Sequence, residues 1–399
     1  MNAPLNLNPT LIRSDAEALD VANAVAAVFG PGAAERDRER LLPHAELELF
    51  SRSGLWGISV PKHLGGAGVS SVTLAKVIAR ISQADSSLGQ IPQNHFYALE
   101  VLRLNGSAEQ QQRLYAEVLA GQRFGNALAE LGTKTALDRT TKLLRDGEHY
   151  RIEGRKFYAT GALYAQRIPT LAVDDQGIGH LAFVSRHAPG LEIIDDWSGF
   201  GQRTTGSGSV VLQQVPVAAE DVVPFQASFE RPTSLGPFAQ LLHAAIDVGI
   251  ARAAYEDTLS FVRSSSRPWI NAGVDKASDD PLTLKAIGRL AIHLHAAEAL
   301  LERAGEFVDQ AQAEPSVESV AAASIAVAEA RAISTEVSLA ASSKLLELAG
   351  SRATLAEHNL DRHWRNARTH TLHDPVRWKY HAVGNYYLND ALPPRRGTI

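Results

Sequence analysis

Residues 360–389 read LDRHWRNARTHTLHDPVRWKYHAVGNYYLN and gather cationic, imidazole and aromatic side chains more densely than the rest of the chain. Histidines alternate there with arginines and with two tryptophans. The histidines are His363, His370, His373 and His381, and the tryptophans are Trp364 and Trp378. Such groups are costly to bury unless each finds a partner. Residue types alone therefore favour a C-terminal helix with a basic, solvated face and its indole rings packed on the core.

The motif R-N-A-R at residues 365–368 leads into the turn T-L-H-D-P at residues 371–375. This pattern resembles the closing segment of the acyl-CoA dehydrogenase superfamily, in which R-D-A-R precedes a Y-E-G-T turn that carries the catalytic glutamate. His373 and Asp374 stand here in place of that turn. A histidine at this point resembles the flavin-dependent organosulfur monooxygenase branch, which includes the dibenzothiophene and methanesulfinate monooxygenases.

Composition excludes several classes of protein. The 399 residues are 45% hydrophobic and 21% charged, a globular balance that predicts two or three domains. The net charge of -5 gives no general reason to bind nucleic acid or anionic membranes. The chain has no cysteine, which excludes disulfides and thiolate metal sites. Residues 1–14 lack a signal-peptide core and no later run could span a bilayer, so we expect a soluble, cytoplasmic protein.

Hydrophobic periodicity divides the chain into three parts. Helical spacing gives way to short strand-like runs separated by Asp-Gly, Glu-Gly, Gln-Gly and Pro-Gly turn signals, and then returns. We predict the α+β class, with a helical domain at residues 1–122, a β-domain at 123–235 and a helical domain at 236–399. The resemblance implies the acyl-CoA dehydrogenase fold, with a β-barrel-like middle, a C-terminal four-helix bundle and a homotetramer.

Two segments resemble flavin-contacting elements of the superfamily. Residues 124–130 resemble its A-L-T-E element along the flavin ring, which implies a catalytic role for Asn126, whose amide would face the flavin or the atom that is oxidised. Residues 154–161 resemble its G-x-K-x-x-I-T/S segment, which implies a catalytic contact of Thr160 near flavin N5, with Tyr158 as an aromatic wall. Without this context, a threonine in a strand is almost always structural.

The loop W-S-G-F-G-Q-R-T-T-G-S-G at residues 197–208 is rich in glycine and hydrogen-bond donors. Glycines let backbone amides approach a ligand, and Arg203 could bind an anion. The loop resembles the superfamily's G-x-R-x-S/T-x-S/T loop, and Trp197 matches a tryptophan that the monooxygenases place against the flavin. A tight solvent loop remains the alternative for its Thr-Gly-Ser-Gly part.

Two further arginines are candidates for binding the flavin phosphate, which a guanidinium fork suits. Arg267 follows a helical segment at the place where the superfamily has a phosphate-binding arginine. Arg352 stands near the place of the Q-x-x-G-G motif of FAD enzymes, whose second glycine is missing here. This departure favours FMN over FAD. Arg352 would then contact the terminal phosphate of FMN across a subunit interface.

The sequence offers three candidates for the substrate pocket, namely His95, Tyr97 and Arg377. In the related monooxygenases the helix that contains His95 and Tyr97 lines the pocket. Arg377, His95 or Asn126 could bind an anionic substrate. A histidine satisfied inside the core is about equally expected at position 95. We expect no metal site, because His293 and His295 do not share a helix face and no metal-binding spacing occurs.

The chemistry separates two flavin hypotheses. A dehydrogenase needs a carboxylate of adequate reach, whereas Asp374 is shorter than glutamate and is restrained before Pro375. A monooxygenase forms a C4a-hydroperoxide from FMNH2 and O2 and needs a proton donor beside it, a role that suits His373. An FAD-dependent acyl-CoA dehydrogenase with Asp374 as base is the alternative, and a catalytically silent binding module is a third hypothesis.

The resemblance to the organosulfur branch implies a reaction and a partner. We expect a two-component enzyme that oxygenates a small organosulfur compound, such as methanesulfinate to methanesulfonate, in sulfur assimilation. No segment reads as an NAD(P)H site, so a separate NAD(P)H:FMN reductase would supply FMNH2.

Overall fold

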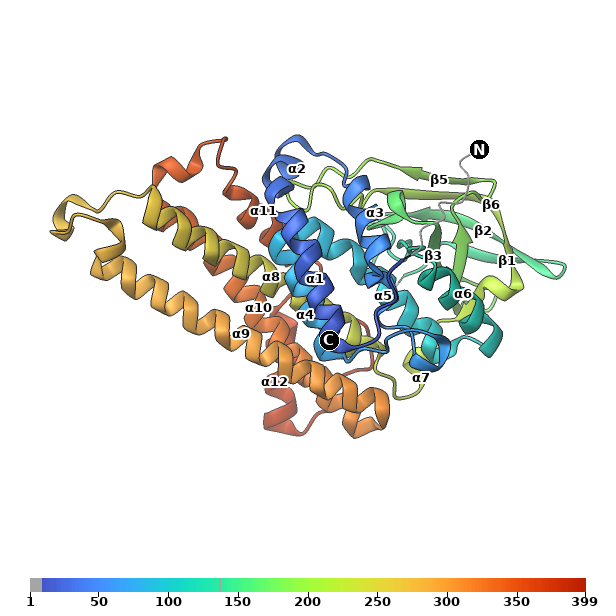
Figure 1. The fold of residues 1–399 in the computed structure, drawn as a ribbon. Coiled ribbons are helices and arrows are strands. Elements are labelled where there is room, and N and C mark those ends of the chain that lie inside the picture. Colours follow the sequence, from blue (N-terminus) through green and yellow to red (C-terminus); the bar gives the residue numbers. More distant parts are fainter. Residues whose placement is uncertain (1–8, 136–137) are drawn as a thin grey trace.

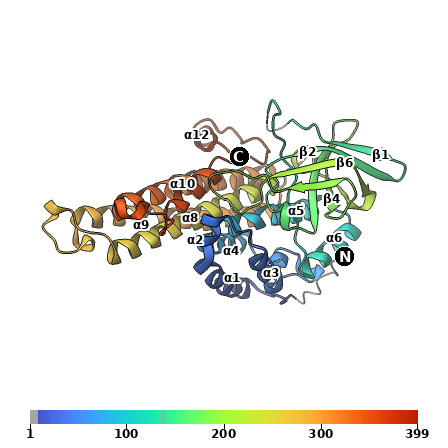
Figure 2. The ribbon, with the colours of Figure 1, turned by 90° about the horizontal axis from the view of Figure 1, so that it is seen from above.

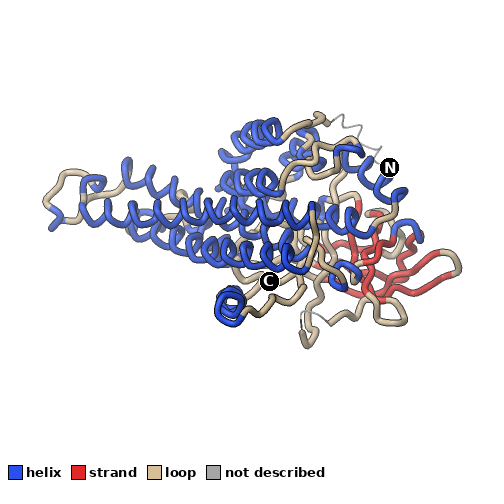
Figure 3. The backbone as a smooth tube through the Cα atoms, turned by 90° about the horizontal axis from the view of Figure 1, so that it is seen from below, coloured by secondary structure: helices blue, strands red, loops and turns tan. Residues whose placement is uncertain are grey.

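The structure is a computed structural model that describes residues 9–135 and 138–399. Helices form a long bundle, and a β-sheet lies at one end of it (Figures 1 and 3). The α+β class and the helix–sheet–helix order agree with the prediction. Within the described ranges, no helix combines the length and apolarity needed to cross a membrane.

The N-terminal part is helical because apolar residues recur at helical spacing and polar residues cap the helices. For example, the Asp85 carboxylate accepts hydrogen bonds from the backbone amides of Ser87 and Leu88, which starts a new helix directly after the previous one ends. The helices are α1 (Asp15–Phe29), α2 (Ala33–Glu39), α3 (His44–Ser53), α4 (Ser71–Ala84), α5 (Ser86–Asn105) and α6 (Ala108–Leu119).

The middle part is a seven-stranded sheet in the order β5-β6-β2-β1-β3-β4-β7. All neighbouring strands are antiparallel except β1 and β3, which pair in parallel. The strands are β1 (Lys142–Asp146), β2 (His149–Lys156), β3 (Arg167–Val173), β4 (Gly179–Ser185), β5 (Leu191–Ile194), β6 (Ser209–Ala218) and β7 (Val222–Pro224). The glycine-rich loop at residues 197–208 connects β5 to β6.

The C-terminal part contains three long helices that lie side by side, with shorter helices beside them (Figure 2). The helices are α7 (Ala227–Glu230), α8 (Leu235–Ser264), α9 (Pro281–Ala313), α10 (Val317–Ala349), α11 (Asp361–His370) and α12 (Arg377–Asn389). The turn that carries His373 joins α11 to α12.

One apolar core joins the N-terminal and C-terminal helices, and a second core belongs to the sheet. Helix α4 packs against both α8 and α9, so the long bundle includes a helix from the first part of the chain. The domain boundaries at 122/123 and 235/236 stay predictions.

The close approach of α8 to α4 gives a stability test at Gly249. A Cβ atom there would lie 2.4 Å from the Ala79 carbonyl oxygen and 2.6 Å from Ser82 Cβ. We expect Gly249→Ala to lower the free energy of unfolding by about 1–3 kcal/mol, because the two helices must separate. The measurement is thermal or denaturant unfolding of the purified protein.

Gly288→Ala in α9 is the matched control, since a Cβ there meets nothing within 4 Å. It should raise the free energy of unfolding by about 0.5–1 kcal/mol, because alanine favours a helix interior over glycine. Equal effects of the two substitutions would contradict the close helix contact.

Candidate active site

His373 lies in the turn between α11 and α12, where its ring pairs with the neighbouring residue. Its Nδ1 atom is 2.8 Å from Asp374 Oδ1, and its side chain is 47% exposed while that of Asp374 is buried. A carboxylate at this distance accepts the Nδ1 proton. The other ring nitrogen, Nε2, is left available for proton exchange.

Asp374 is surrounded by donors from three other elements. Gln240 Nε2 donates to its Oδ1 at 3.0 Å, while Lys379 Nζ lies 3.4 Å and Arg331 Nε 3.9 Å from its Oδ2. Burial raises the pKa of Asp374, but His373, Arg331 and Lys379 together outweigh burial and hold this pKa well below its usual range. Such a carboxylate is a weak base, which disfavours removal of a substrate proton by Asp374.

A cluster that the sequence reading missed lies behind His373. The His243 ring, from α8, lies 4.0 Å from the His373 ring with an angle of 35° between their planes. His243 Nδ1 is 3.1 Å from His370 Nε2, and His370 Nδ1 is 2.6 Å from Asp247 Oδ1. Arg331, which belongs to α10, forms a salt bridge with Asp247. The i, i+4 spacing of His243 and Asp247, in the otherwise apolar residues 241–251 of α8, was the signal that could have revealed them.

The structure brings together four of the predicted flavin-contacting residues. Asn126 Nδ2 donates to the Tyr158 carbonyl at 3.1 Å, and Tyr158 has a left-handed φ of 57° that turns the chain here. The half-exposed Tyr158 ring packs edge-on against Trp197 at 6.2 Å. Trp197 Nε1 donates to the Gln202 carbonyl, and Thr160 lies two residues after Tyr158, buried beside the same loop.

Thr160 is the last of three buried hydroxyl groups, after Thr205 and Ser207, whose hydrogen bonds all point the same way. The Gln202 carbonyl can only accept, so Thr205 Oγ1 donates to it at 2.9 Å. Ser207 then donates to Thr205 at 2.7 Å, and Thr160 donates to Ser207 at 2.7 Å. This order leaves the Thr160 oxygen as an acceptor for an outside N–H group.

Helix α11 links this sheet-side group to the histidine cluster. Asn366 Oδ1 accepts from the backbone amide of Gln202 at 2.7 Å, and Arg365 Nη1 donates to the Phe200 carbonyl at 3.0 Å. A Cβ on Gly201 would lie 2.0 Å from the Arg365 carbonyl oxygen, so the loop approaches the helix as closely as a glycine permits. The R-N-A-R motif therefore fixes the β5–β6 loop, and the His373 turn follows it directly.

The predicted phosphate-binding arginines do not all lie together. Arg203 is partly buried in the loop at residues 197–208. Arg267 and Arg352 are exposed, in the segments that follow α8 and α10. These segments lie at the end of the bundle away from the sheet (Figure 1). Within one chain, Arg267 and Arg352 are thus separated from Trp197, and their phosphate contact stays a prediction.

The substrate-pocket candidates have different surroundings. His95 is fully buried; its Nε2 is 2.9 Å from the Trp56 carbonyl, and its Nδ1 accepts from the Phe124 amide at 3.0 Å. Both ring nitrogens are therefore used inside the core, and the geometry supports the satisfied core histidine rather than a substrate contact. Tyr97 is also buried, whereas Arg377 is exposed at the start of α12.

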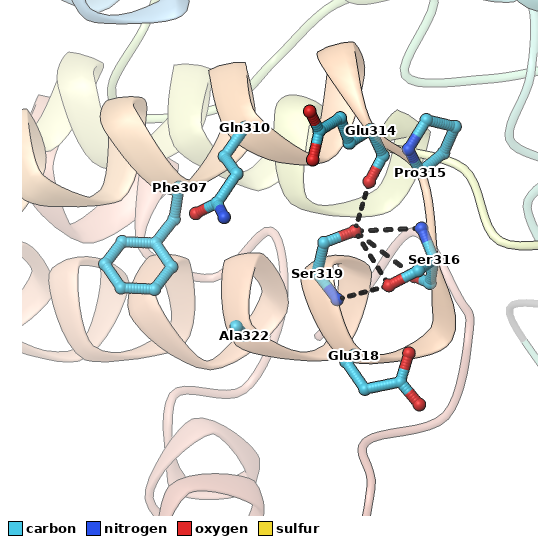
Figure 4. Close-up of a pocket in the computed structure, with 8 residues that line it drawn as sticks. All are labelled: Phe307, Gln310, Glu314, Pro315, Ser316, Glu318, Ser319 and Ala322. Atoms are coloured by element: carbon cyan, nitrogen blue, oxygen red, sulfur yellow. Dashed lines mark hydrogen bonds between the residues drawn. The ribbon is translucent and has the colours of Figure 1, made fainter.

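A cavity of about 560 Å³ lies at the turn between α9 and α10 (Figure 4). None of the predicted site residues lines it. Its eight described lining residues include Glu314 and Glu318 but no cation, which disfavours an anionic ligand. Among the residues that the structure describes, no group of three or more His, Cys, Asp or Glu is arranged to hold a metal ion.

Family comparison agrees with this architecture. Residues 17–122 match the family described as "Acyl-CoA dehydrogenase, N-terminal domain", and residues 241–378 match "Acyl-CoA dehydrogenase, C-terminal domain". The chain belongs to the acyl-CoA dehydrogenase family. His243, His370 and His373 all lie in the C-terminal family domain, and His95 lies in the N-terminal one.

Similar proteins place the chain in the flavin-dependent monooxygenase branch of the acyl-CoA dehydrogenase family. A dibenzothiophene monooxygenase from Mycolicibacterium goodii is 33% identical with 94% of both chains covered. The probable FMNH2-dependent monooxygenase SfnC from Pseudomonas putida is 32% identical with 98% of both chains covered.

Two solved structures share the fold at similar identity. FMN-bound TdsC from Paenibacillus sp. A11-2 has a TM-score of 0.91 and 33% identity, with 96% of this chain and 100% of that chain covered. Methanesulfinate monooxygenase MsuC from Pseudomonas fluorescens has a TM-score of 0.88 and 31% identity, with coverage of 96% and 99%. The acyl-CoA dehydrogenase fold predicted from the sequence is thus confirmed.

The core role of His95 predicts a pH dependence of stability. Burial lowers its pKa from 6.5 to about 3, so the folded protein keeps it neutral while the unfolded chain protonates it. The unfolded state then binds more protons between these values, and the free energy of unfolding falls by about 1.4 kcal/mol per unit of decreasing pH. Denaturant unfolding at several pH values measures this slope.

His95→Gln is the comparison, because its amide can still donate to the Trp56 carbonyl. The variant should have a lower free energy of unfolding than wild type at neutral pH. As the pH decreases, this free energy should fall less steeply than in wild type, because one proton fewer is taken up on unfolding. Equal slopes would show that His95 does not stay neutral in the fold.

Proposed function

We propose that this protein is an FMNH2-dependent monooxygenase that oxygenates a small organosulfur compound, with His373 as the acid–base residue. The observation that carries the proposal is the His373–Asp374 pair in the turn after the R-N-A-R motif. The half-exposed imidazole has a ring nitrogen, Nε2, that can take up or release a proton, whereas the carboxylate is held ionised by its neighbours. This arrangement supports oxygenation and disfavours the alternative, an FAD-dependent acyl-CoA dehydrogenase with Asp374 as base.

The residues around the sheet fit a reduced flavin. Reduced FMN carries an N–H group at N5, and Thr160 presents an acceptor because its own proton is directed to Ser207. Tyr158 and Trp197 offer aromatic surface, and Asn126 lies against the Tyr158 backbone. When bound, FMNH2 would supply the two electrons that activate O2. Arg267 and Arg352 would bind the phosphate of a flavin in a neighbouring subunit of a homotetramer.

The most specific form of the proposal is oxidation of methanesulfinate to methanesulfonate. One atom of O2 would go to sulfur and the other would leave as water, with FMNH2 oxidised to FMN. His373 would hold or donate the proton needed by the departing oxygen, and the exposed Arg377 could bind the sulfinate anion. The similarity to MsuC supports this substrate, and the similarity to dibenzothiophene monooxygenases supports the wider organosulfur class. An NAD(P)H:FMN reductase would supply FMNH2.

The role of His373 is tested by His373→Gln. The variant keeps a polar side chain but cannot exchange a proton, so sulfonate formation should fall by about 10²–10⁴-fold. FMNH2 binding should stay close to wild type, and O2 should instead yield hydrogen peroxide. The measurement mixes protein loaded with anaerobically reduced FMN with O2 and methanesulfinate, and quantifies sulfonate and hydrogen peroxide.

His381→Gln, at an exposed histidine on α12, is the control and should behave as wild type. Unchanged sulfonate yield in His373→Gln would remove His373 from the mechanism. Reduction of a bound FAD by an acyl-CoA in the wild-type protein would establish the dehydrogenase instead.

The direction of the hydroxyl chain is tested by Thr205→Val. Valine removes the acceptor for Ser207, whose proton can then turn toward Thr160 and leave Thr160 free to donate. Oxidised FMN has an acceptor at N5, so its affinity relative to FMNH2 should rise by about 3–10-fold, the size of one hydrogen bond. Titrations with oxidised FMN and with anaerobic FMNH2 measure the ratio.

Thr258→Val is the control, because the buried Thr258 hydroxyl bonds to the Ala254 carbonyl of its own helix. An unchanged affinity ratio in Thr205→Val would show that this chain does not govern the choice between the two flavin states.

A further inference from the structure

The turn that carries His373 offers little by itself to hold the ring. Leu372 is 65% exposed and Pro375 is also exposed, so the turn has few side-chain contacts on either side of the histidine. The backbone amide of His373 donates to the His370 carbonyl at 3.0 Å, which fixes the main chain but not the ring. The orientation of the imidazole therefore depends on Asp374 and on the His243 ring.

The rings of His243 and His373 are in contact in a tilted arrangement. It is 4% exposed, and its ring lies 4.0 Å from that of His373 with planes at 35°. His243 directs Nδ1 to His370 instead, at 3.1 Å. His243 thus supplies a flat surface against which the second imidazole rests.

The proton positions in the cluster fix His243 in one form. Asp247 is paired with Arg331 and accepts the Nδ1 proton of His370 at 2.6 Å. His370 Nε2 is then an acceptor, so His243 must donate its Nδ1 proton to it. Burial lowers the pKa of both His370 and His243, and the positive field of Arg331 lowers both further, so both rings are neutral. The neutral His243 ring cannot turn without breaking this bond.

Arg331 lies beside both carboxylates of the cluster, Asp247 and Asp374. Its Nη1 pairs with Asp247, and its Nε faces Asp374 Oδ2 at 3.9 Å. Asp374 Oδ1 in turn holds His373 Nδ1. The two supports of His373, one at its Nδ1 atom and one at its face, are therefore both anchored on one buried arginine.

We propose that His243 is a positioning residue that holds the His373 imidazole in its working orientation by ring-to-ring contact, with His370, Asp247 and Arg331 fixing His243. This inference rests on the proposed role of His373 in oxygenation. It separates two properties of His243, the flat ring and the Nδ1 donor, and assigns the positioning of His373 to the ring.

Three variants separate these properties. His243→Phe keeps a flat ring but cannot donate to His370. His243→Asn can donate from its amide at the place of Nδ1 but has no ring. His243→Leu has neither property but has nearly the volume of histidine, so a role in core packing alone would favour leucine over the larger phenylalanine.

The first readout uses the protein without flavin. Diethyl pyrocarbonate modifies neutral imidazoles, and mass spectrometry gives the rate at His373 relative to the exposed His149 in the same sample. We expect His243→Phe to keep the wild-type relative rate and His243→Asn and His243→Leu to raise it several-fold, because the released ring becomes more accessible. The second readout is sulfonate formed per O2 consumed, which should stay high in His243→Phe and fall by about tenfold or more in the other two. Thermal unfolding confirms that each variant is folded.

Retained positioning in His243→Asn with loss in His243→Phe would overturn the proposal and assign the role to the hydrogen bond. Equal behaviour of His243→Phe and His243→Leu would reduce His243 to core packing. Absence of sulfonate formation in the wild type would refute the proposed function, while the modification rates would still decide whether His243 holds His373.

Discussion

Arg331 is buried in α10 with its guanidinium between two carboxylates, Asp247 of α8 and Asp374 of the C-terminal turn. Removing one partner of such a buried pair typically costs about 3–5 kcal/mol, because the other charge is left without compensation. Helices α8 and α10 and the turn after α11 are therefore held in one arrangement. Since α8 and α10 form part of the bundle core, the turn that carries His373 takes its position from that core.

Helix α11 connects this arrangement to the sheet. Its middle contacts the β5–β6 loop through Arg365 and Asn366, and its end supplies His370 to the histidine cluster. The sheet side contributes amide, hydroxyl and aromatic groups, while the bundle side contributes the titratable ones. The groups proposed to bind the flavin and those proposed to transfer protons thus lie in different parts of the fold, and one short helix connects them.

The same fold can serve dehydrogenation or oxygenation because its chemistry depends on a few side chains. Here Asp374 is engaged by Gln240 and His373 and lies within the field of Lys379 and Arg331, which stabilises its ionised form. A carboxylate in this state is a poor proton acceptor but a good partner for an imidazole. In the proposed mechanism, a His–Asp pair in place of a catalytic glutamate would change the reaction class within one architecture.

The sequence by itself determined the α+β class, the helix–sheet–helix order and the turn that carries His373, because these follow from local periodicity and from contiguous motifs. It also indicated Asn126, Tyr158, Thr160 and Trp197, which the fold brings together. It could not decide the state of His95, nor reveal the cluster behind His373. His243 and His370 are 127 residues apart, and Asp247 and Arg331 are 84 apart. Their pairing depends on how long helices pack, and only the tertiary structure fixes which buried polar groups then meet.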